Sequence, residues 1–186
     1  MFFDLKEYAK AHNIPIITDD GLLFLKTLIK DNNVKNILEI GTAIGYSALN
    51  MASYNTNVVS LEKDEALYNI ALENIKQYNY EDKVCVILHD ATKDYQFTKK
   101  FDLIFIDGAK AQYIKFFTNF KDYLNPKGII VTDNLSFHNL KPENVNRHTR
   151  QLLRKIESFK TFLKENQDYE TIFYNIGDGM SVSKRR

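Results

Sequence analysis

The chain has 186 residues and a formal net charge of +1, with 44% hydrophobic and 26% charged residues, the composition of an ordinary globular protein. It has no run of about 18 uncharged apolar residues, so we expect no transmembrane helix, and its first residues become acidic too early for a secretory signal. Its single cysteine, Cys85, excludes an internal disulfide framework and a multi-cysteine zinc site. We therefore expect one cytoplasmic domain over residues 1–186, with no membrane partner.

Short apolar runs alternate with helical patterns along most of the chain. Two helices are expected first, at about 2–11 and 20–30. Runs of about five apolar residues then predict strands that are buried on both faces, at 36–40, 57–62, 84–88, 102–107 and 128–133. Helices are expected between them, notably at 64–78, with Asp64 as the N-cap, and at 110–123. This alternation predicts an α/β fold with right-handed βαβ units and a mostly parallel, doubly wound sheet.

The end of the chain has a different pattern. Residues 144–166 predict one long helix with an apolar stripe, and two strand-like runs follow at 169–174 and 179–183. The segment between these runs carries a hairpin turn signal. We therefore expect a single domain with N-terminal helices at 1–33, a ligand-binding core at 34–134, and a basic helix with an antiparallel hairpin at 135–186.

The first predicted strand ends in a glycine turn, Glu39-x-Gly41-x-x-x-Gly45. Ligands of doubly wound sheets bind at the carboxyl ends of the strands, where glycine lets the backbone approach a ligand closely. The spacing matches neither the dinucleotide fingerprint nor the P-loop. Because a carboxylate stands beside the turn where a phosphate site would have a lysine, the motif favours a cationic or amino-bearing ligand. The alternative is an ordinary strand-to-helix turn.

Acidic residues also end the next two strands. Glu62 follows Gly41 by 21 positions, the placement from which a carboxylate accepts hydrogen bonds from ribose hydroxyls. Asp90 ends the third strand and precedes the small residue Ala91, a pair that can contact an adenine edge and leave room for the ring. Either acid could instead be a solvated loop residue, but the spacing favours a role in binding a nucleoside.

The fourth and fifth strands carry the strongest combination. Asp107-Gly108-Ala109-Lys110 follows one strand, and Asp133-Asn134 ends the other. Two carboxylates and an amide therefore come to neighbouring strand ends. Hard oxygen ligands without His or Cys suit Mg²⁺ or another hard divalent cation rather than zinc. The alternative is that each aspartate caps the helix after its strand.

These motifs together resemble those of the cation-dependent class I S-adenosylmethionine (SAM) O-methyltransferases, the branch that includes the catechol and caffeoyl-CoA enzymes. The resemblance rests on Glu39-x-Gly41-x-x-x-Gly45 with Glu62, Asp90-Ala91, Asp107-x-x-Lys110 and Asp133-Asn134, and it covers nearly the whole chain. It implies a Rossmann-like fold with a seven-stranded, mostly parallel sheet, an antiparallel C-terminal hairpin and helices on both faces. It also implies a homodimer.

Within that branch the chain most resembles the small bacterial enzymes that methylate 5-hydroxyuridine at the wobble position of tRNA. This narrower resemblance rests on Ile14-Pro15-Ile16, on residues 133–137, on the basic stretch through Arg154 and on residues 176–180. It implies that the product is 5-methoxyuridine and that the partner is the anticodon loop of tRNA.

The resemblance also assigns roles to individual residues. SAM would be bound by Ile14, Glu39, Gly41, Ser47, Glu62, Asp90, Ala91 and Asp107. Mg²⁺ would be held by Asp107, Asp133 and Asn134. Lys110 would be the catalytic base, and Asp107 would act beside it between the cofactor and the metal.

The formal charge is divided unevenly along the chain. Residues 1–134 carry 15 Lys and Arg against 18 Asp and Glu, whereas residues 135–186 carry 10 against 6. Arg147, Arg150 and Arg154 fall on one face of the predicted long helix, roughly opposite its apolar stripe. They could meet the phosphates of tRNA, although an ordinary solvated helix face would look the same in the sequence.

Two other functions are compatible with the sequence. One is a small-molecule O-methyltransferase of the catechol or caffeoyl-CoA type on the same scaffold. The other is a non-catalytic module that binds SAM or a nucleotide. The presence of Asp107, Lys110, Asp133 and Asn134 argues against the non-catalytic module. The charge of the outer surface and the width of the cleft mouth would distinguish tRNA from a small phenol, and the sequence shows neither.

Overall fold

The computed structural model describes residues 2–136 and 146–186. The helices are α1 (Phe3–Ala11), α2 (Asp19–Asp31), α3 (Tyr46–Ala52), α4 (Glu65–Gln77), α5 (Tyr113–Phe120) and α6 (Arg147–Lys164), and α5 lies between the short 3-10 segments η1 (Lys110–Gln112) and η2 (Lys121–Tyr123). The strands are β1 (Asn36–Ile40), β2 (Asn57–Glu62), β3 (Val84–Leu88), β4 (Phe101–Ile106), β5 (Leu124–Thr132), β6 (Tyr169–Tyr174) and β7 (Met180–Arg185).

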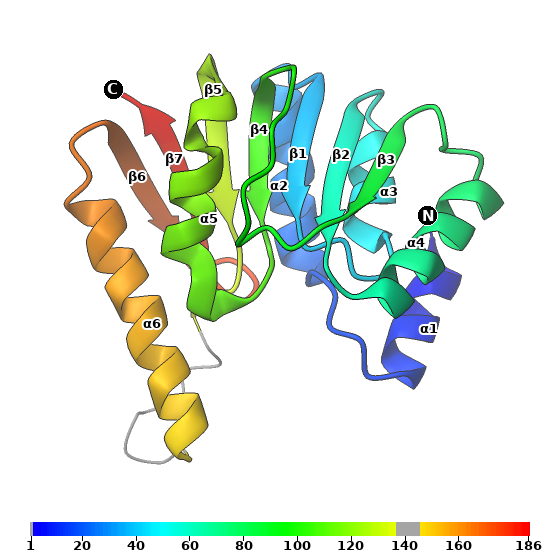
Figure 1. Cartoon of the computed structure of the whole chain (residues 1–186), viewed down its shortest axis with the longest axis horizontal. Coiled ribbons are helices and arrows are strands. Elements are labelled where there is room, and N and C mark those ends of the chain that lie inside the picture. Colours follow the sequence, from blue (N-terminus) through cyan, green and yellow to red (C-terminus); the bar gives the residue numbers. More distant parts are fainter. Residues whose placement is uncertain (1, 137–145) are drawn as a thin grey trace.

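The seven strands form one twisted sheet in the order β3-β2-β1-β4-β5-β7-β6 (Figure 1). Strands β1 to β5 pair in parallel, and β7 pairs antiparallel with both β5 and β6. The strand order reverses between β1 and β4, and this topological switch point is where ligands bind in doubly wound sheets. The structure confirms the mostly parallel sheet with an antiparallel hairpin at its end.

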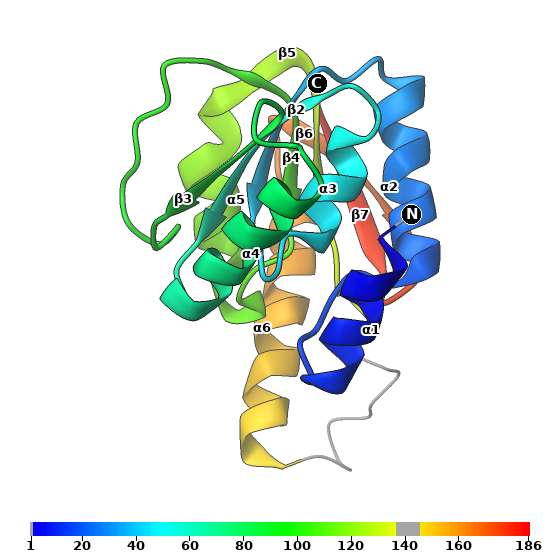
Figure 2. The ribbon, with the colours of Figure 1, turned by 90° about the vertical axis from the view of Figure 1, so that its right-hand side faces the viewer.

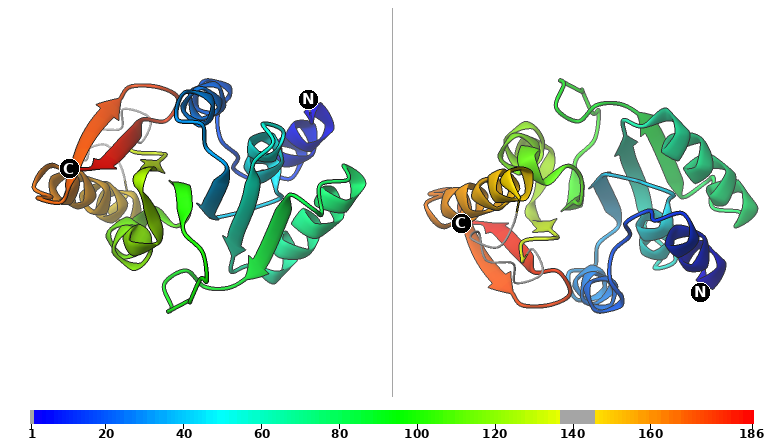
Figure 3. Two further views of the ribbon diagram at one scale, coloured as in Figure 1. Left: turned by 90° about the horizontal axis from the view of Figure 1, so that it is seen from above. Right: turned by 90° about the horizontal axis from the view of Figure 1, so that it is seen from below.

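Helices cover both faces of the sheet, as the resemblance implies. One apolar core joins α1 to α4 to the strand residues of one face, and a second joins α5 and α6 to the other face. The second core is rich in aromatic rings, and the centroids of Tyr113 on α5 and Phe159 on α6 are 5.4 Å apart. Figure 2 shows the sheet between these two layers. At the ends of the sheet lie α1 on one side and α6 on the other (Figure 3).

Side-chain caps explain where several helices begin. Asp64 Oδ1 accepts hydrogen bonds from the backbone N–H groups of Ala66 and Leu67, at 2.9 and 3.0 Å, which confirms the predicted N-cap of α4. Asn146 caps α6 in the same way, since its Oδ1 accepts from Thr149 N at 2.9 Å. Each cap satisfies backbone donors that the first turn of a helix leaves unpaired.

The bounds of three predicted elements differ from the structure by three residues or more. The helix expected at 110–123 is divided into η1, α5 and η2, and β5 begins at Leu124 rather than at residue 128. Pro126 and Gly128 lie inside β5 and interrupt its apolar pattern, so the pattern reveals only the second half of the strand. The long helix expected from residue 144 begins at Arg147, after its cap, while residues 144 and 145 fall outside the described part of the chain.

Across residues 2–136 and 146–186, every helix is too short or too polar to cross a membrane. The first turns of α6 extend beyond the carboxyl ends of the parallel strands, on the same side of the molecule as the ends of β1 and β4 (Figures 1 and 2).

Candidate active site

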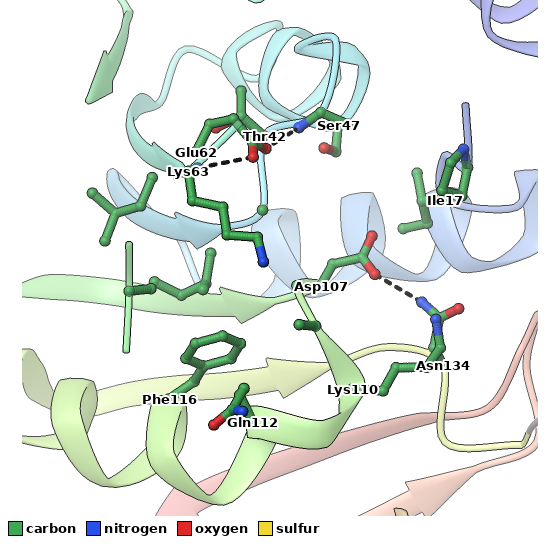
Figure 4. A pocket seen from close by; sticks show the side chains of 18 of the residues that line it. Ile17, Thr42, Ser47, Glu62, Lys63, Asp107, Lys110, Gln112, Phe116 and Asn134 are labelled. Carbon is green, nitrogen blue, oxygen red and sulfur yellow. Dashed lines mark hydrogen bonds between the residues drawn. The ribbon is translucent and has the colours of Figure 1, made fainter. Parts of the chain in front are cut away.

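A cavity of about 630 Å³ opens at the carboxyl ends of the parallel strands, at the topological switch point between β1 and β4. Figure 4 shows how side chains from several strand ends face it. The cavity is lined by these predicted site residues: Gly41, Ser47, Glu62, Asp90, Ala91, Asp107, Lys110 and Asn134. Ile14, Glu39 and Asp133 are absent from its lining, although Pro15, Ile16 and Ile17 beside Ile14 are present.

The glycine turn after β1 needs glycine for two physical reasons. Gly41 has a φ of +102°, and a Cβ there would lie 2.6 Å from the backbone oxygen of Asp107. L residues with a side chain rarely adopt so positive a φ. A Cβ that close to a backbone oxygen would also collide with the end of β4. The turn therefore brings the backbone of β1 directly against the strand end that carries Asp107.

Glu62 fastens the glycine turn to the end of β2. Its Oε2 accepts a hydrogen bond from Ala43 N at 2.9 Å, and its Oε1 accepts from Lys63 N and Asp64 N at 2.8 and 2.9 Å. The side chain is 8% exposed, at the cavity wall. A carboxylate has about four lone-pair positions, so Glu62 can hold the turn and still accept hydrogen bonds from ligand hydroxyls.

Asp90 lies at the same edge and is held in its charged form. Thr92 N donates to Asp90 Oδ1 at 2.9 Å, and this backbone hydrogen bond lowers the pKa of Asp90. Ala91 beside it is 7% exposed and lines the cavity. The end of β3 thus offers an ionised acceptor next to a small side chain, as the sequence predicts.

Glu39 occupies a place that the sequence does not indicate. Its side chain is 0% exposed and accepts hydrogen bonds from Ser47 Oγ and Ser60 Oγ, each at 2.5 Å. Burial raises the pKa of Glu39 to about 7 although these two hydroxyls act in the opposite direction. Because side chains alternate along a strand, Glu39 points into the layer of α3 rather than off the end of β1. Glu39, a predicted SAM-binding residue, therefore lies behind the residues that line the cavity.

The predicted metal ligands do come together. Asn134 Nδ2 donates to Asp107 Oδ1 at 2.7 Å (Figure 4), and Asn134 N donates to Asp133 Oδ1 at 2.7 Å. Burial raises the pKa of Asp107 well above its usual range, and the charge of Asp133 adds to this while Lys110 opposes it. Burial likewise raises the pKa of Asp133. The state in which Asp107 and Asp133 are both ionised is therefore unfavourable without a cation.

This donor set fits a hard divalent cation. Among the described residues no group of three or more His, Cys, Asp and Glu side chains converges as a metal site, so the candidate donors are the two carboxylates and the amide of Asn134. A cation would offset the excess negative charge that raises both pKa values. The Asn134 side chain turns its nitrogen to Asp107, and rotating the amide by half a turn would present the oxygen instead.

Asp178 lines the cavity without having been predicted as a site residue. It lies in the turn between β6 and β7, and its charge raises the pKa of Asp107 and of Asp133. Ser136 N donates to the backbone oxygen of Asp178 at 2.6 Å, and Leu135 N donates to that of Gly179 at 2.8 Å. The sheet topology could have indicated this residue. Because β7 runs antiparallel to β5, the turn before β7 lies where β5 ends.

Thr42, Lys63, Gln112 and Phe116 also line the cavity without having been predicted. In Figure 4 the Lys63 side chain extends from the end of β2 over the cavity. These residues follow or flank the predicted ones, but their residue types alone indicate no chemistry. Only the folded geometry separates them from other loop residues.

The three arginines of α6 lie outside the cavity lining. Arg147, Arg150 and Arg154 are exposed in the N-terminal half of α6, and the first turns of this helix extend past the strand ends (Figure 1). The predicted apolar stripe is confirmed on the opposite face, where Ile156, Phe159 and Leu163 are buried and Leu152 is half-buried. The helix therefore packs with its apolar side inward and turns its arginines to the outside.

Comparisons with known proteins agree with this geometry. A family model described as O-methyltransferase matches residues 4–186. A tapetum-specific methyltransferase from Arabidopsis thaliana and a caffeoyl-CoA O-methyltransferase from Populus kitakamiensis are each 28% identical, over 97% of this chain and 82% of their own length. A Staphylococcus aureus structure assigned as a caffeoyl-CoA O-methyltransferase is 37% identical, with a TM-score of 0.92 over 98% of this chain and 91% of its own. An O-methyltransferase from Bacillus cereus in complex with SAH has a TM-score of 0.80 at 24% identity, over 98% of this chain and 89% of its own.

Proposed function

This chain belongs to the O-methyltransferase family, and we propose that it transfers a methyl group from SAM to a hydroxyl oxygen held beside a divalent cation. Membership follows from the match over residues 4–186, which confirms the resemblance at the level of the family. As the acceptor we propose the 5-hydroxyl of 5-hydroxyuridine in the anticodon loop of tRNA, so that 5-methoxyuridine is the product. The observation that carries the proposal is the single cavity that joins the glycine turn and Glu62 to Asp107 and Asn134.

The cavity contains the groups that a nucleoside methyl donor requires. Glu62 is fixed where it can accept hydrogen bonds from ribose hydroxyls, and Asp90 is ionised beside Ala91 where it can meet an adenine edge. Gly41 lets the glycine turn lie directly against the backbone of Asp107. The Bacillus cereus enzyme of the same fold contains SAH, which supports SAM as the donor here.

The acceptor half of the cavity supplies the means to deprotonate a hydroxyl. A divalent cation bound by Asp107, Asp133 and Asn134 would favour the ionised form of the acceptor oxygen. Lys110 lines the same cavity, so its amine, when neutral, can accept the hydroxyl proton. Asp107 lies against the glycine turn and so connects the donor half to the acceptor half. The remaining contribution is positioning, because the acceptor oxygen must meet the methyl carbon in line, at roughly 3 Å.

Two features of α6 support tRNA as the acceptor. The arginine-bearing turns extend past the strand ends on the side where the cavity opens, and the arginines are exposed on one face. Guanidinium groups make strong, directional contacts with phosphates. An RNA loop whose base enters the cavity would have its backbone within reach of this helix.

A small phenolic acceptor is the second candidate, and a specific observation favours it. The 28% and 37% identical relatives include proteins named as caffeoyl-CoA O-methyltransferases. A catechol has two adjacent oxygens, as does 5-hydroxyuracil with O5 and O4, so the acidic half of the cavity suits both. Under this alternative the arginines of α6 would form an ordinary solvated surface.

Parallel acceptor assays separate the two candidates. The protein is incubated with methyl-labelled SAM and Mg²⁺ and with one of three acceptors: hypomodified tRNA that contains 5-hydroxyuridine, catechol, or caffeoyl-CoA. We expect the highest kcat/KM with tRNA and no transfer in EDTA. A higher kcat/KM with either phenol would establish the second candidate, and the absence of transfer to all three acceptors would contradict the proposal as a whole.

A further inference from the structure

Tyr113, the first residue of α5, places a buried hydroxyl beside the proposed cation site, although it lies outside the lining of the cavity. Its side chain is 1% exposed, and its Oη donates a hydrogen bond to the backbone oxygen of Asp133 at 3.0 Å. Burial raises the pKa of Tyr113 well above its usual range, and the charges of Asp107 and Asp133 add to this. The hydroxyl therefore keeps its proton and remains a donor at the edge of the acidic site.

This hydrogen bond holds the peptide group that joins two of the proposed cation ligands. The peptide group has the backbone oxygen of Asp133 at one end and the backbone N–H of Asn134 at the other. Tyr113 holds the oxygen, and Asp133 Oδ1 accepts a hydrogen bond from the N–H at 2.7 Å. Because both ends are held, the plane of this peptide group cannot turn without breaking a buried hydrogen bond, which is costly.

The orientation of this peptide group determines where the Asn134 side chain lies. Asn134 has a φ of +65°, in the left-handed region that few residues other than glycine, asparagine and aspartate adopt. In this conformation its amide reaches the end of β4, where Nδ2 lies 2.7 Å from Asp107 Oδ1. A negative φ would direct the side chain away from Asp107. The peptide group that Tyr113 holds thus sets the positions of Asp133 and Asn134 together.

Tyr113 also connects the other parts of the acceptor half. It follows Lys110, the candidate base, by three residues, because η1 leads directly into α5. Its ring packs edge-on against the buried ring of Phe159 on α6, with the two centroids 5.4 Å apart. One side chain therefore ties the segment that carries Lys110 to the strand end that carries Asp133, and α6 supports it from behind.

We propose that Tyr113 is a positioning residue that holds the peptide group between Asp133 and Asn134 in the orientation that cation binding requires. The proposal rests on the proposed function, since it takes a divalent cation as the ligand of Asp107, Asp133 and Asn134. Tyr113 acts through a backbone oxygen and is not itself a cation ligand. Groups of this kind, one step removed from a metal, orient the ligands and so raise the affinity of the site.

Binding of Mn²⁺ tests the proposal without methyl transfer. Mn²⁺ takes the same kinds of oxygen ligand as Mg²⁺, and electron paramagnetic resonance measures the free ion in the presence of S-adenosylhomocysteine. Tyr113→Phe keeps the ring and removes the hydroxyl. We expect this change to weaken Mn²⁺ binding about tenfold or more, the usual effect of removing a group that orients a metal ligand, and to leave calorimetric binding of S-adenosylhomocysteine within about twofold.

Tyr169→Phe is the matched control. Tyr169 belongs to the same aromatic core and is 2% exposed, and its Oη also donates to a backbone oxygen, that of Lys121 at 3.3 Å. It begins β6 and pairs with Arg185 at the end of β7, so it lies near the amino ends of the parallel strands, away from the acids. This variant also loses a buried hydrogen bond, but its affinity for Mn²⁺ should not change.

The dependence of methyl transfer on Mg²⁺ concentration is a second readout. Because Tyr113 acts on the cation ligands and not on the reacting atoms, Tyr113→Phe should need more Mg²⁺ for half-maximal transfer and should reach a kcat within about threefold of the wild type at saturating Mg²⁺. Phe159→Leu keeps the tyrosine hydroxyl and loosens the support of its ring, so it should weaken Mn²⁺ binding by a smaller factor. This second variant decides the question if Tyr113→Phe folds poorly.

The possible results are distinguishable. An unchanged affinity for Mn²⁺ in Tyr113→Phe would mean that the hydroxyl only satisfies a buried carbonyl group, and an equal loss in Tyr169→Phe would mean that any weakening of the aromatic core has this effect. If Tyr113→Phe no longer binds S-adenosylhomocysteine, an unchanged affinity for Mn²⁺ in Phe159→Leu has the same meaning. Each of these results overturns the inference and leaves the proposed function intact. A wild type that binds S-adenosylhomocysteine but no Mn²⁺ would instead contradict the cation of the proposed function, and the inference would fail with it.

Discussion

The carboxyl groups at the strand ends show that similar residues acquire different properties from their surroundings. Asp90 receives a backbone hydrogen bond and has a lowered pKa, whereas burial raises the pKa of Glu39, Asp107 and Asp133. The sequence predicts these acids by their spacing along βαβ units. It cannot predict which acid lies behind the cavity wall, because that depends on the side of β1 that α3 covers.

Replacing Asp133 tests the acidic half of the cavity at the scale of one residue. We expect Asp133→Ala to abolish cation-dependent methyl transfer, because the donor set loses a buried carboxylate, and to leave binding of S-adenosylhomocysteine largely unchanged. Labelled-methyl transfer and calorimetry measure the two effects. Asp94→Ala, on the exposed loop after β3, is the control. Wild-type activity that survives EDTA would show that the cation has no role.

Glu39 also predicts how stability depends on pH. Its pKa is about 7 in the folded protein against 4.5 for an unperturbed glutamate, so between these values the folded state binds more protons than the unfolded state. The stability that Glu39 contributes is therefore lost as the pH rises through this range. At pH 8 the cost is at most about 3 kcal/mol, and Glu39→Gln should remove it. Urea unfolding at pH 5 and pH 8 measures the change; a Gln variant that gains no stability at pH 8 relative to pH 5 would contradict the expectation.

At the scale of elements, most strands could be predicted because each is a continuous apolar run bounded by polar residues. Four of them, β1, β2, β3 and β6, have the predicted bounds, but β5 begins earlier because Pro126 and Gly128 interrupt its pattern. Local sequence patterns could not predict that the turn between β6 and β7 lies beside Asp107 and Asp133. It depends on β7 pairing with β5, a contact between residues far apart in the sequence.

Helix α6 carries the prediction that belongs to a single element. Replacing Arg147, Arg150 and Arg154 together by alanine should weaken tRNA binding and reduce the slope of log affinity against log salt by up to about 2, since each phosphate contact with a single-stranded loop contributes about 0.7. Filter binding between 50 and 200 mM salt measures this. Activity on catechol should not change, because the arginines lie outside the cavity lining.

The matched control replaces three other exposed cations, Lys30, Lys76 and Lys127, which lie near the amino ends of the parallel strands. If the lysine variant loses as much affinity as the arginine variant, tRNA binding is spread over the surface and α6 is not the recognition element. If neither variant loses affinity, α6 does not contact tRNA.

For the whole molecule, the net charge of +1 combines two regions of opposite character. The acids at the strand ends surround the cavity, and the excess of basic residues follows residue 134. We propose that the first region binds a sulfonium donor and a cation, and that the second binds an RNA backbone. Near-neutral composition is therefore compatible with a nucleic-acid substrate when the charges are separated in space.

Nucleoside mass spectrometry tests the central claim most directly. Hypomodified tRNA is incubated with the protein, SAM and Mg²⁺ and digested to nucleosides, and 5-hydroxyuridine and 5-methoxyuridine are quantified. We expect 5-methoxyuridine to appear in proportion to the 5-hydroxyuridine lost, and the omission of either SAM or Mg²⁺ to prevent the conversion. Unchanged 5-hydroxyuridine, in a sample where the same protein methylates catechol or caffeoyl-CoA, would contradict the tRNA assignment.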